Sequence, residues 1–197
     1  MNTFDELTQY GIVHLVPILQ ADSMEYMESL LKSLQPKWFL EIGTAIGRTA
    51  IDAAMTVDGL HVVTIEKDPE MAALARENIQ KAGLEERVML IEGDALETDI
   101  PHETYDLIFI DAAKGQYRRF FERYAPYLSE DGVIVSDNMF FHGLVLHPER
   151  TKNRHTKGLI KRLQRYREFL ESLEDFETEI LDTGDGIALT RRRKQHA

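Results

Sequence analysis

Short apolar runs alternate along the chain with longer stretches in which apolar residues recur every three or four positions. The runs are five or six residues long and rich in β-branched side chains. Runs of this kind are typical of buried strands, and the longer spacing is typical of amphipathic helices. Strands that alternate with helices form a parallel sheet with right-handed crossovers. We therefore predict an α/β fold with helices on both faces of the sheet.

The apolar runs predict seven strands. Five central strands are expected at residues 38–42, His61–Glu66, Val88–Glu92, Tyr105–Ile110 and Gly132–Ser136. The segments Phe176–Leu181 and Gly186–Thr190 flank a turn with two glycines, which predicts an antiparallel hairpin at the C-terminal end. Helical spacing covers Phe4–Tyr10, Ser23–Leu34, Thr49–Met55, Asp68–Lys81, Tyr117–Leu128 and Arg154–Leu173. The sheet should be mostly parallel, with the hairpin at one edge.

A single domain is expected over residues 1–197, because this length supports one sizeable core and no linker interrupts the pattern. Residues 1–35 would form an N-terminal helical cap. Within it, the apolar segment 13–19 contains the helix-breaking Pro17 and could pack over the mouth of a site. Methionine and leucine residues at helical spacing in Ser23–Leu34 fit either core packing or, less simply, a cofactor-binding stripe.

Composition narrows the functional classes. No apolar run approaches the roughly 18 residues needed to span a bilayer, and no export signal is recognisable at the N-terminus, so a cytoplasmic location is expected. With no cysteine, a metal would need oxygen or imidazole ligands. The net charge of −11 by itself argues against a nucleic-acid-binding protein.

A glycine-containing turn follows the first strand. The segment from Trp38 to Gly47 runs from apolar residues into Gly43 and Gly47, with the spacing G-x-x-x-G. This spacing differs from those of dinucleotide-binding folds and of nucleoside triphosphate hydrolases. Gly43 would form a tight bend and Gly47 a close approach to a ligand, although a purely structural strand-turn-helix would look the same.

Each of the five central strands ends near an acidic residue: Glu41, Glu66, Asp94, Asp111, and Asp137 beside Asn138. In an open α/β sheet the ligand crevice lies outside the carboxyl ends of the strands, so these side chains should converge. Glu66 lies at the end of the second strand, where a carboxylate can accept hydrogen bonds from ribose hydroxyls. A plain strand-end acid in water is the alternative. Asp94 could border an adenine ring or could close an Asx turn.

Five segments together resemble the successive motifs of the class I S-adenosylmethionine-dependent O-methyltransferases: Leu40–Gly47, Ile65–Asp68, Glu92–Ala95, Ile110–Lys114 and Ser136–Asn138. The resemblance is strongest to the metal-dependent subgroup that contains catechol and caffeoyl-CoA methyltransferases. It covers nearly the whole chain and implies a Rossmann-like methyltransferase fold. It also implies a homodimer.

The resemblance carries roles over to residues of this chain. It implies that S-adenosylmethionine is bound by Leu19, Glu41, Gly43, Thr44, Gly47, Thr49, Glu66, Lys67, Gly93, Asp94, Ala95 and Asp111. It implies that Mg²⁺ or another divalent cation is held by Asp111, Asp137 and Asn138, and that Lys114 is the catalytic base. Two carboxylates and an amide oxygen suit Mg²⁺ and leave positions for an acceptor that chelates through two neighbouring oxygens. Without the resemblance, Lys114 would be interpreted as a surface lysine.

The methyl acceptor is predicted from a basic stretch. Between His142 and Arg167 the chain has eight basic residues and one acid, Glu149. Together with the preceding segment 138–145, this stretch resembles the bacterial subgroup that methylates 5-hydroxyuridine at the wobble position of tRNA. The positive charges would neutralise phosphates of the tRNA anticodon loop, and Phe140, Phe141 or Tyr166 could stack on bases. The seven histidines show no ligand spacing, and His142 and His147 are expected to be loop residues.

Several alternatives stay open at this point. The basic stretch also fits a solvated helix face in an enzyme that methylates a vicinal-diol small molecule. A non-catalytic nucleoside- or RNA-binding module is a third hypothesis. The chain also departs from its relatives at two positions. Arg48 follows the second glycine where an aromatic residue is common, and alanines precede Lys114 where many plant-type members have an acid.

Overall fold

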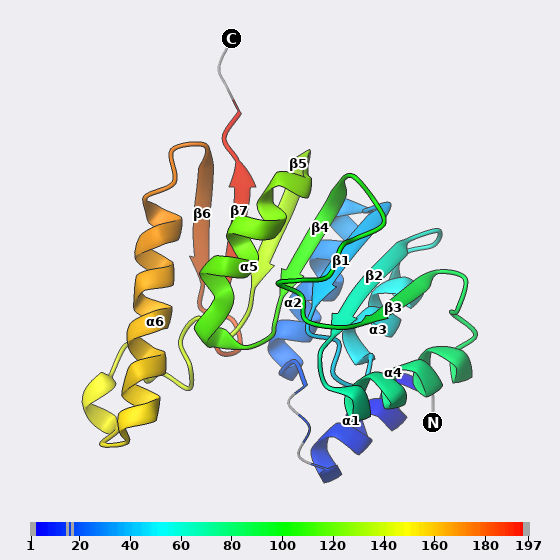
Figure 1. The fold of residues 1–197 in the computed structure, drawn as a ribbon, viewed down its shortest axis with the longest axis horizontal. Coiled ribbons are helices and arrows are strands. Elements are labelled where there is room, and N and C mark those ends of the chain that lie inside the picture. The colour runs from blue at the N-terminus through cyan, green and yellow to red at the C-terminus, as the bar shows by residue number, and fades with distance from the viewer. Residues whose placement is uncertain (1–2, 15, 17, 195–197) are drawn as a thin grey trace.

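The computed structural model describes residues 3–14, 16 and 18–194 and contains one seven-stranded sheet (Figure 1). The strands are β1 (Trp38–Ile42), β2 (His61–Glu66), β3 (Val88–Glu92), β4 (Tyr105–Ile110), β5 (Leu128–Ser136), β6 (Phe176–Leu181) and β7 (Ile187–Arg192). Their order in the sheet is β3-β2-β1-β4-β5-β7-β6. The first five are parallel, whereas β7 runs antiparallel to both β5 and β6. The predicted fold class, including the C-terminal hairpin, is confirmed.

Helices cover both faces of the sheet. They are α1 (Thr3–His14), α2 (Ala21–Leu34), α3 (Arg48–Thr56), α4 (Pro69–Lys81), α5 (Tyr117–Tyr124) and α6 (Arg154–Glu171). Successive residues of one strand face opposite layers: Phe39 packs with α1 to α4, and Leu40 packs with α5 and α6. Figure 1 shows α5 and α6 in front of the sheet and α2 and α3 behind it. Two apolar cores therefore fix the sheet between the helix layers.

Local sequence explains where several helices begin and end. Asp68 caps α4 through its side chain, which accepts hydrogen bonds from the backbone N–H groups of Glu70 and Met71, and Pro69 fills the first helical position. Asn153 caps α6 in the same way, through the N–H of Thr156. These side-chain caps define where α4 and α6 begin.

The largest differences between the predicted boundaries and the structure occur at three points. The first helix extends to His14, beyond the predicted end at Tyr10, and Pro17 lies outside the described residues. The predicted helix to Leu128 ends at Tyr124, because Pro126 has no N–H for a further helical hydrogen bond, and a 3₁₀ turn follows. The fifth strand therefore begins at Leu128, ahead of Gly132, with a register shift against β4.

The methionine and leucine residues of helix α2 were predicted either to pack in the core or to bind a cofactor. Met24, Met27, Leu30 and Leu31 are buried in the core between the sheet and α3. None of them lines the cavity described below. The core-packing interpretation is thus confirmed.

Within the described part of the chain, no helix is both long enough and apolar enough to cross a membrane.

Candidate active site

The carboxyl ends of the five parallel strands form one row. The backbone hydrogen bonds continue one residue past four of them, with N–H donors and C=O acceptors at 2.8 to 3.3 Å: Asp137 to Ile110, Asp111 to Ile42, Gly43 to Ile65, and Gly93 to Glu66. Acidic residues that are far apart in the sequence are therefore neighbours at this edge. The convergence expected from the strand pattern is observed.

A cavity of about 660 Å³ opens above this row. Its walls come from the ends of β1, β2 and β4, from the turn after β3 and from the chain before α2. Ten of the residues predicted to bind the cofactor line it: Leu19, Gly43, Thr44, Thr49, Glu66, Lys67, Gly93, Asp94, Ala95 and Asp111. Glu41 and Gly47 do not line it. The cavity has the size of a typical small-molecule site.

The two glycines of the turn have different tasks. Gly43 has a φ of 101°, and a Cβ there would collide with the backbone carbonyl of Asp111. Only glycine lets the end of β1 approach β4 so closely. Gly47 has a φ of 84° and faces Ala75 of α4, with 3.4 Å between its ideal Cβ position and the Ala75 Cβ. Its predicted close approach is thus to a neighbouring helix.

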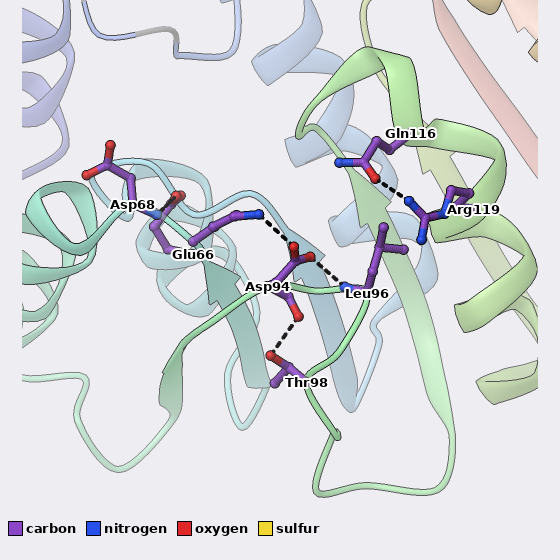
Figure 2. A network of polar contacts seen from close by, with 8 residues as sticks. Glu66, Asp68, Asp94, Leu96, Thr98, Gln116 and Arg119 are labelled. Atoms are coloured by element: carbon purple, nitrogen blue, oxygen red, sulfur yellow. Dashed lines mark hydrogen bonds and ion pairs between the residues drawn. The ribbon is translucent and has the colours of Figure 1, made fainter.

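Glu66 is held by two backbone donors. Its Oε2 accepts from the N–H of Ala45, and its Oε1 accepts from the N–H of Asp68, both at 2.8 Å. Figure 2 shows Glu66 beside Asp68 at the start of α4. Because each carboxylate oxygen has a second lone pair, Glu66 can also accept from a ligand. Glu66 is therefore held by the backbone and is not a free strand-end acid in water, and its contact with a ribose stays a prediction.

Asp94 closes a turn and also lines the cavity. Its Oδ1 accepts from the N–H of Leu96 at 2.9 Å, which is an Asx turn, and its Oδ2 accepts from Lys67 Nζ at 2.6 Å (Figure 2). The hydrogen bond from Lys67 lowers the pKa of Asp94. The Asx turn is therefore confirmed, whereas contact between Asp94 and an adenine ring stays a prediction. Lys67 is held at the cavity rim by its ion pair with Asp94.

Glu41 lies beneath the glycine turn and is 1% exposed. Thr64 Oγ1 donates to its Oε2 at 2.5 Å, and the hydroxyls of Thr64 and Thr44 are also 2.5 Å apart. Burial raises the pKa of Glu41 to about 8, with smaller contributions from Asp111 and Glu66. Contact between Glu41 and the cofactor, as the resemblance implied, is therefore not supported by the lining of the cavity.

This buried acid predicts a pH-dependent stability. Protonated Glu41 contributes stability that is complete below its ordinary pKa of 4.5 and is lost as pH rises towards about 8. The unfolding free energy of wild type, compared with Glu41→Gln, should fall by up to about 1.4 kcal/mol per pH unit in this window. Thermal denaturation at pH 5 and pH 8 measures it. The exposed Glu85→Gln is the control, and an equal difference at both pH values would refute the assignment.

The predicted metal ligands follow β4 and β5. Asp137 is 1% exposed; its Oδ1 accepts from Ser23 Oγ at 3.3 Å and its Oδ2 from Asn138 Nδ2 at 2.8 Å. Burial and the nearby carboxylate of Asp111 raise the pKa of Asp137 to about 7. Burial also raises the pKa of Asp111, and Lys114 opposes that shift. Two desolvated carboxylates that repel each other form a site that a cation would stabilise.

The third predicted metal ligand, Asn138, has an unusual backbone conformation. Asn138 has a φ of 60°, in the left-handed region that asparagine tolerates better than most residues. The described residues contain no cluster of three histidine, cysteine, aspartate or glutamate side chains suited to a metal ion. A cation at this edge would therefore need the amide oxygen of Asn138 beside the two carboxylates, and that mixed set fits Mg²⁺.

Lys114 follows Asp111 by three residues. It opens a short 3₁₀ turn, Lys114–Gln116, and lines the cavity beside Asp111. Its ammonium group makes no hydrogen bond or ion pair with the part of the chain that the structure describes. Lys114 thus lies at the cavity near both carboxylates, and its role as catalytic base stays a prediction.

Sequence reasoning missed two residues near these carboxylates. Ser23 reaches Asp137 from α2, 114 positions away in the sequence. Tyr117 on α5 is 1% exposed and its hydroxyl has no hydrogen-bond partner among the described residues. Burial, with Asp111 and Asp137 nearby, raises the pKa of Tyr117 well above its usual range. Neither residue belongs to a local motif, so no sequence signal marked them.

The parallel sheet with a reversed last strand and the crevice at its carboxyl edge define a class I S-adenosylmethionine-dependent methyltransferase. Within that class, the chain belongs to the O-methyltransferase family, whose sequence profile matches residues 2–193. Caffeoyl-CoA O-methyltransferase 2 from Populus trichocarpa is 32% identical over 190 residues, which span 88% of this chain and 74% of that protein.

Solved structures agree with this assignment. A Staphylococcus aureus protein, provisionally named a caffeoyl-CoA O-methyltransferase, superimposes with a TM-score of 0.93 at 34% identity, covering 98% of this chain and 93% of that one. The Podospora anserina methyltransferase PaMTH1, solved with S-adenosylhomocysteine, gives a TM-score of 0.88 at 26% identity, covering 98% and 89%. The protein is thus an S-adenosylmethionine-dependent O-methyltransferase.

Proposed function

We propose that the enzyme methylates one hydroxyl of a vicinal oxygen pair, with a divalent cation held by Asp111, Asp137 and Asn138. The observation that carries this proposal is a pair of interacting carboxylates, the partly buried Asp111 that lines the cavity and the buried Asp137, with Lys114 near both. Bound S-adenosylmethionine supplies an electrophilic methyl group, and a cation at this site would lower the pKa of an acceptor hydroxyl.

The chain's own residues have separable tasks in this proposal. Glu66 and the Gly43 turn bind and orient the methyl donor from the β1 and β2 side of the cavity. Asp137 and Asn138 define the acceptor side, because they follow the neighbouring strand β5. Lys114 would accept the proton of the acceptor hydroxyl at its Nζ. The reacting groups are thereby held together, which lowers the entropic part of the barrier.

A small catechol-type molecule is the acceptor that the relatives favour. The Populus protein and the Staphylococcus protein are both named for caffeoyl-CoA methylation, and the matches span most of each chain. A catechol presents two adjacent oxygens, which is the chelating pair that a site with three protein ligands leaves room for. The acceptor proposed first is therefore a vicinal-diol small molecule.

One observation keeps the tRNA wobble base, 5-hydroxyuridine, as a second candidate. Eight basic residues occupy α6 and the segment before it, and none forms an ion pair with the described residues: Arg150, Lys152, Arg154, Lys157, Lys161, Arg162, Arg165 and Arg167. Arg162 packs over Gly115, with 3.0 Å from its Nη1 to an ideal Cβ there, next to Lys114. Unpaired cations at the acceptor side suit a polyanion.

The structure corrects one part of the tRNA prediction. Tyr166 is 2% exposed and its hydroxyl lies 2.8 Å from Ser136 Oγ, so it cannot stack on a base. Its ring packs edge-on against Tyr117 in the core. Phe140 and Phe141 remain partly exposed in the loop after Asn138. Base stacking, if it occurs, would have to use these two rings.

A paired assay separates the two acceptors. We expect purified enzyme with Mg²⁺ to methylate catechols, and neutralising Arg154, Lys157 and Lys161 together with glutamine to leave that rate within about twofold, because exposed charges act weakly on a neutral acceptor. If tRNA lacking the modification is the better acceptor, the same variant should lose more than about tenfold in activity and show a shallower salt dependence.

A matched triple variant, Lys32→Gln, Lys81→Gln and Lys194→Gln, removes the same number of positive charges from other parts of the surface. It controls for the change in net charge. Each of these lysines is exposed and pairs with a nearby acid. It should resemble wild type with both acceptors. Methylation of neither catechols nor tRNA in the presence of Mg²⁺ would refute the vicinal-oxygen proposal.

A further inference from the structure

Arg48 is a buried cation at the cofactor cavity whose task the methyl-transfer chemistry does not explain. It is the first residue of α3, directly after the Gly47 cap, and is 5% exposed. It lines the cavity together with Thr49. Buried arginines normally occur with several polar partners, because five N–H donors must be satisfied. Its partners therefore indicate what it does.

Those partners lie in the N-terminal segment. Arg48 Nε donates to Thr8 Oγ1 of α1 at 2.9 Å, and its Nη1 donates to the backbone carbonyl of Leu19 at 3.0 Å. One guanidinium thus joins the start of α3 to two points in the chain before α2. The planar donor fork of arginine fixes both points in one geometry, which a lysine cannot do.

The segment held by Arg48 forms one wall of the cavity. Val16, Ile18 and Leu19 all line it, and Leu19 is 5% exposed. The segment also folds back on α1, because the N–H of Val16 donates to the carbonyl of Gly11 at 3.0 Å. A Cβ on Gly11 would collide with Ile18, so this return is tightly packed. Apolar side chains at this wall exclude water from whatever occupies the cavity.

The electrostatic surroundings favour keeping the guanidinium in place. Burial lowers the pKa of Arg48, and the acids Asp52 and Glu28 oppose that shift. Asp52 is one helical turn further along α3, and Glu28 belongs to α2. Arg48 therefore interacts electrostatically with Asp52 and Glu28, while it donates hydrogen bonds to Thr8 and Leu19. A neutral side chain would lose the electrostatic interaction.

We propose that Arg48 is a positioning residue that holds α1 and the wall residues Val16, Ile18 and Leu19 in place at the S-adenosylmethionine cavity. It sets cofactor affinity through the wall that Val16, Ile18 and Leu19 form, without touching the reacting atoms. This role rests on the proposed assignment of the cavity to S-adenosylmethionine, and it is independent of the acceptor and of the metal.

The test measures cofactor binding without turnover. Calorimetric titration of Arg48→Met with S-adenosylhomocysteine should give a dissociation constant raised about tenfold, equivalent to about 1.4 kcal/mol. Arg48→Lys should be intermediate. Thr8→Val removes the acceptor of the Arg48 Nε hydrogen bond while the guanidinium itself is kept, and should raise the constant by about threefold. In the wild type, but not in Arg48→Met, bound ligand should slow amide exchange in α1.

Two further variants make the outcomes distinguishable. Arg76→Met removes an exposed arginine of α4 that pairs with Glu92 outside the cavity, and it should bind like wild type. Glu66→Gln reports on the cavity itself. If Glu66→Gln binds weakly while Arg48→Met and Thr8→Val bind like wild type, the positioning role is refuted. If Glu66→Gln also binds like wild type, the assignment of the cavity fails.

A purely structural role would give a different pattern. In that case Arg48→Met would melt at a lower temperature, yet its folded fraction would titrate with the wild-type constant, and the proposal would be wrong. Under the proposal, the KM for S-adenosylmethionine rises while kcat at saturating cofactor stays within about twofold, because only binding is affected. If Arg48→Met does not fold, Thr8→Val and Arg48→Lys still decide.

Discussion

We expect Asp137→Ala to abolish metal-stimulated methyl transfer, with kcat/KM lowered by at least about 10³-fold, or about 4 kcal/mol of transition-state stabilisation. Asp137 is 1% exposed and follows β5, near the partly buried Asp111. Removing it takes one charge from the proposed cation site, and the two remaining ligands bind Mg²⁺ much more weakly. Steady-state turnover over a Mg²⁺ titration measures the effect.

The same variant has a readout that does not depend on activity. Mg²⁺ should raise the melting temperature of wild type, because a ligand that binds only the folded state stabilises it, and should leave Asp137→Ala unchanged. Asp131→Ala, which removes an exposed acid paired with Lys194, is the control and should respond like wild type. Full wild-type activity in a strong chelator would overturn the metal assignment for all three ligands.

Lys114→Met is expected to have an effect of similar size. Loss of a general base typically lowers turnover by about 10²- to 10⁴-fold. Lys114 is the only lysine besides Lys67 among the described residues that line the cavity, and it is the one beside Asp111. Methionine keeps most of the side-chain length, so the neighbouring packing should survive. Single-turnover rates with saturating cofactor and acceptor measure the chemical step directly.

Binding measurements separate this role from a positional one. S-adenosylhomocysteine should bind Lys114→Met as it binds wild type, because Glu66 is unchanged. Mg²⁺ should bind no more weakly, because the substitution removes a positive charge that acts on Asp111 and Asp137. Lys67→Met is the matched control: it removes the other lysine of the cavity, the partner of Asp94, and should weaken cofactor binding more than turnover. A turnover rate for Lys114→Met within threefold of wild type would exclude Lys114 as the base.

The architecture was accessible from the sequence because its strands are buried on both faces. Continuous apolar runs such as His61–Glu66 and Tyr105–Ile110 have the same bounds in the structure as in the prediction. The site followed from the same fact, since parallel strands that end in acids must bring those acids to one edge. Asp68 with Pro69 likewise marked the start of α4. The homodimer stays a prediction.

What the sequence did not reveal depends on contacts between distant elements. Tyr166 sits in a basic helix and looked available for stacking, but tertiary packing turns it inward, where it meets Ser136. Arg48 looked like an irregularity of the glycine turn, because its partners Thr8 and Leu19 come from another segment. Glu41 carries no local sign of being sealed beneath the turn. Side-chain direction and burial of this kind are set by the assembled layers.

Because Gly43 has no side chain, the backbone beneath the proposed donor site lies directly against the backbone of Asp111, the first proposed metal ligand. The end of β1 rests directly on the carbonyl of Asp111, and no side chain fits between them. The floor under the methyl donor and the first proposed metal ligand are therefore one rigid backbone unit. A displacement of the Gly43 turn would therefore reach Asp111 through a single backbone contact.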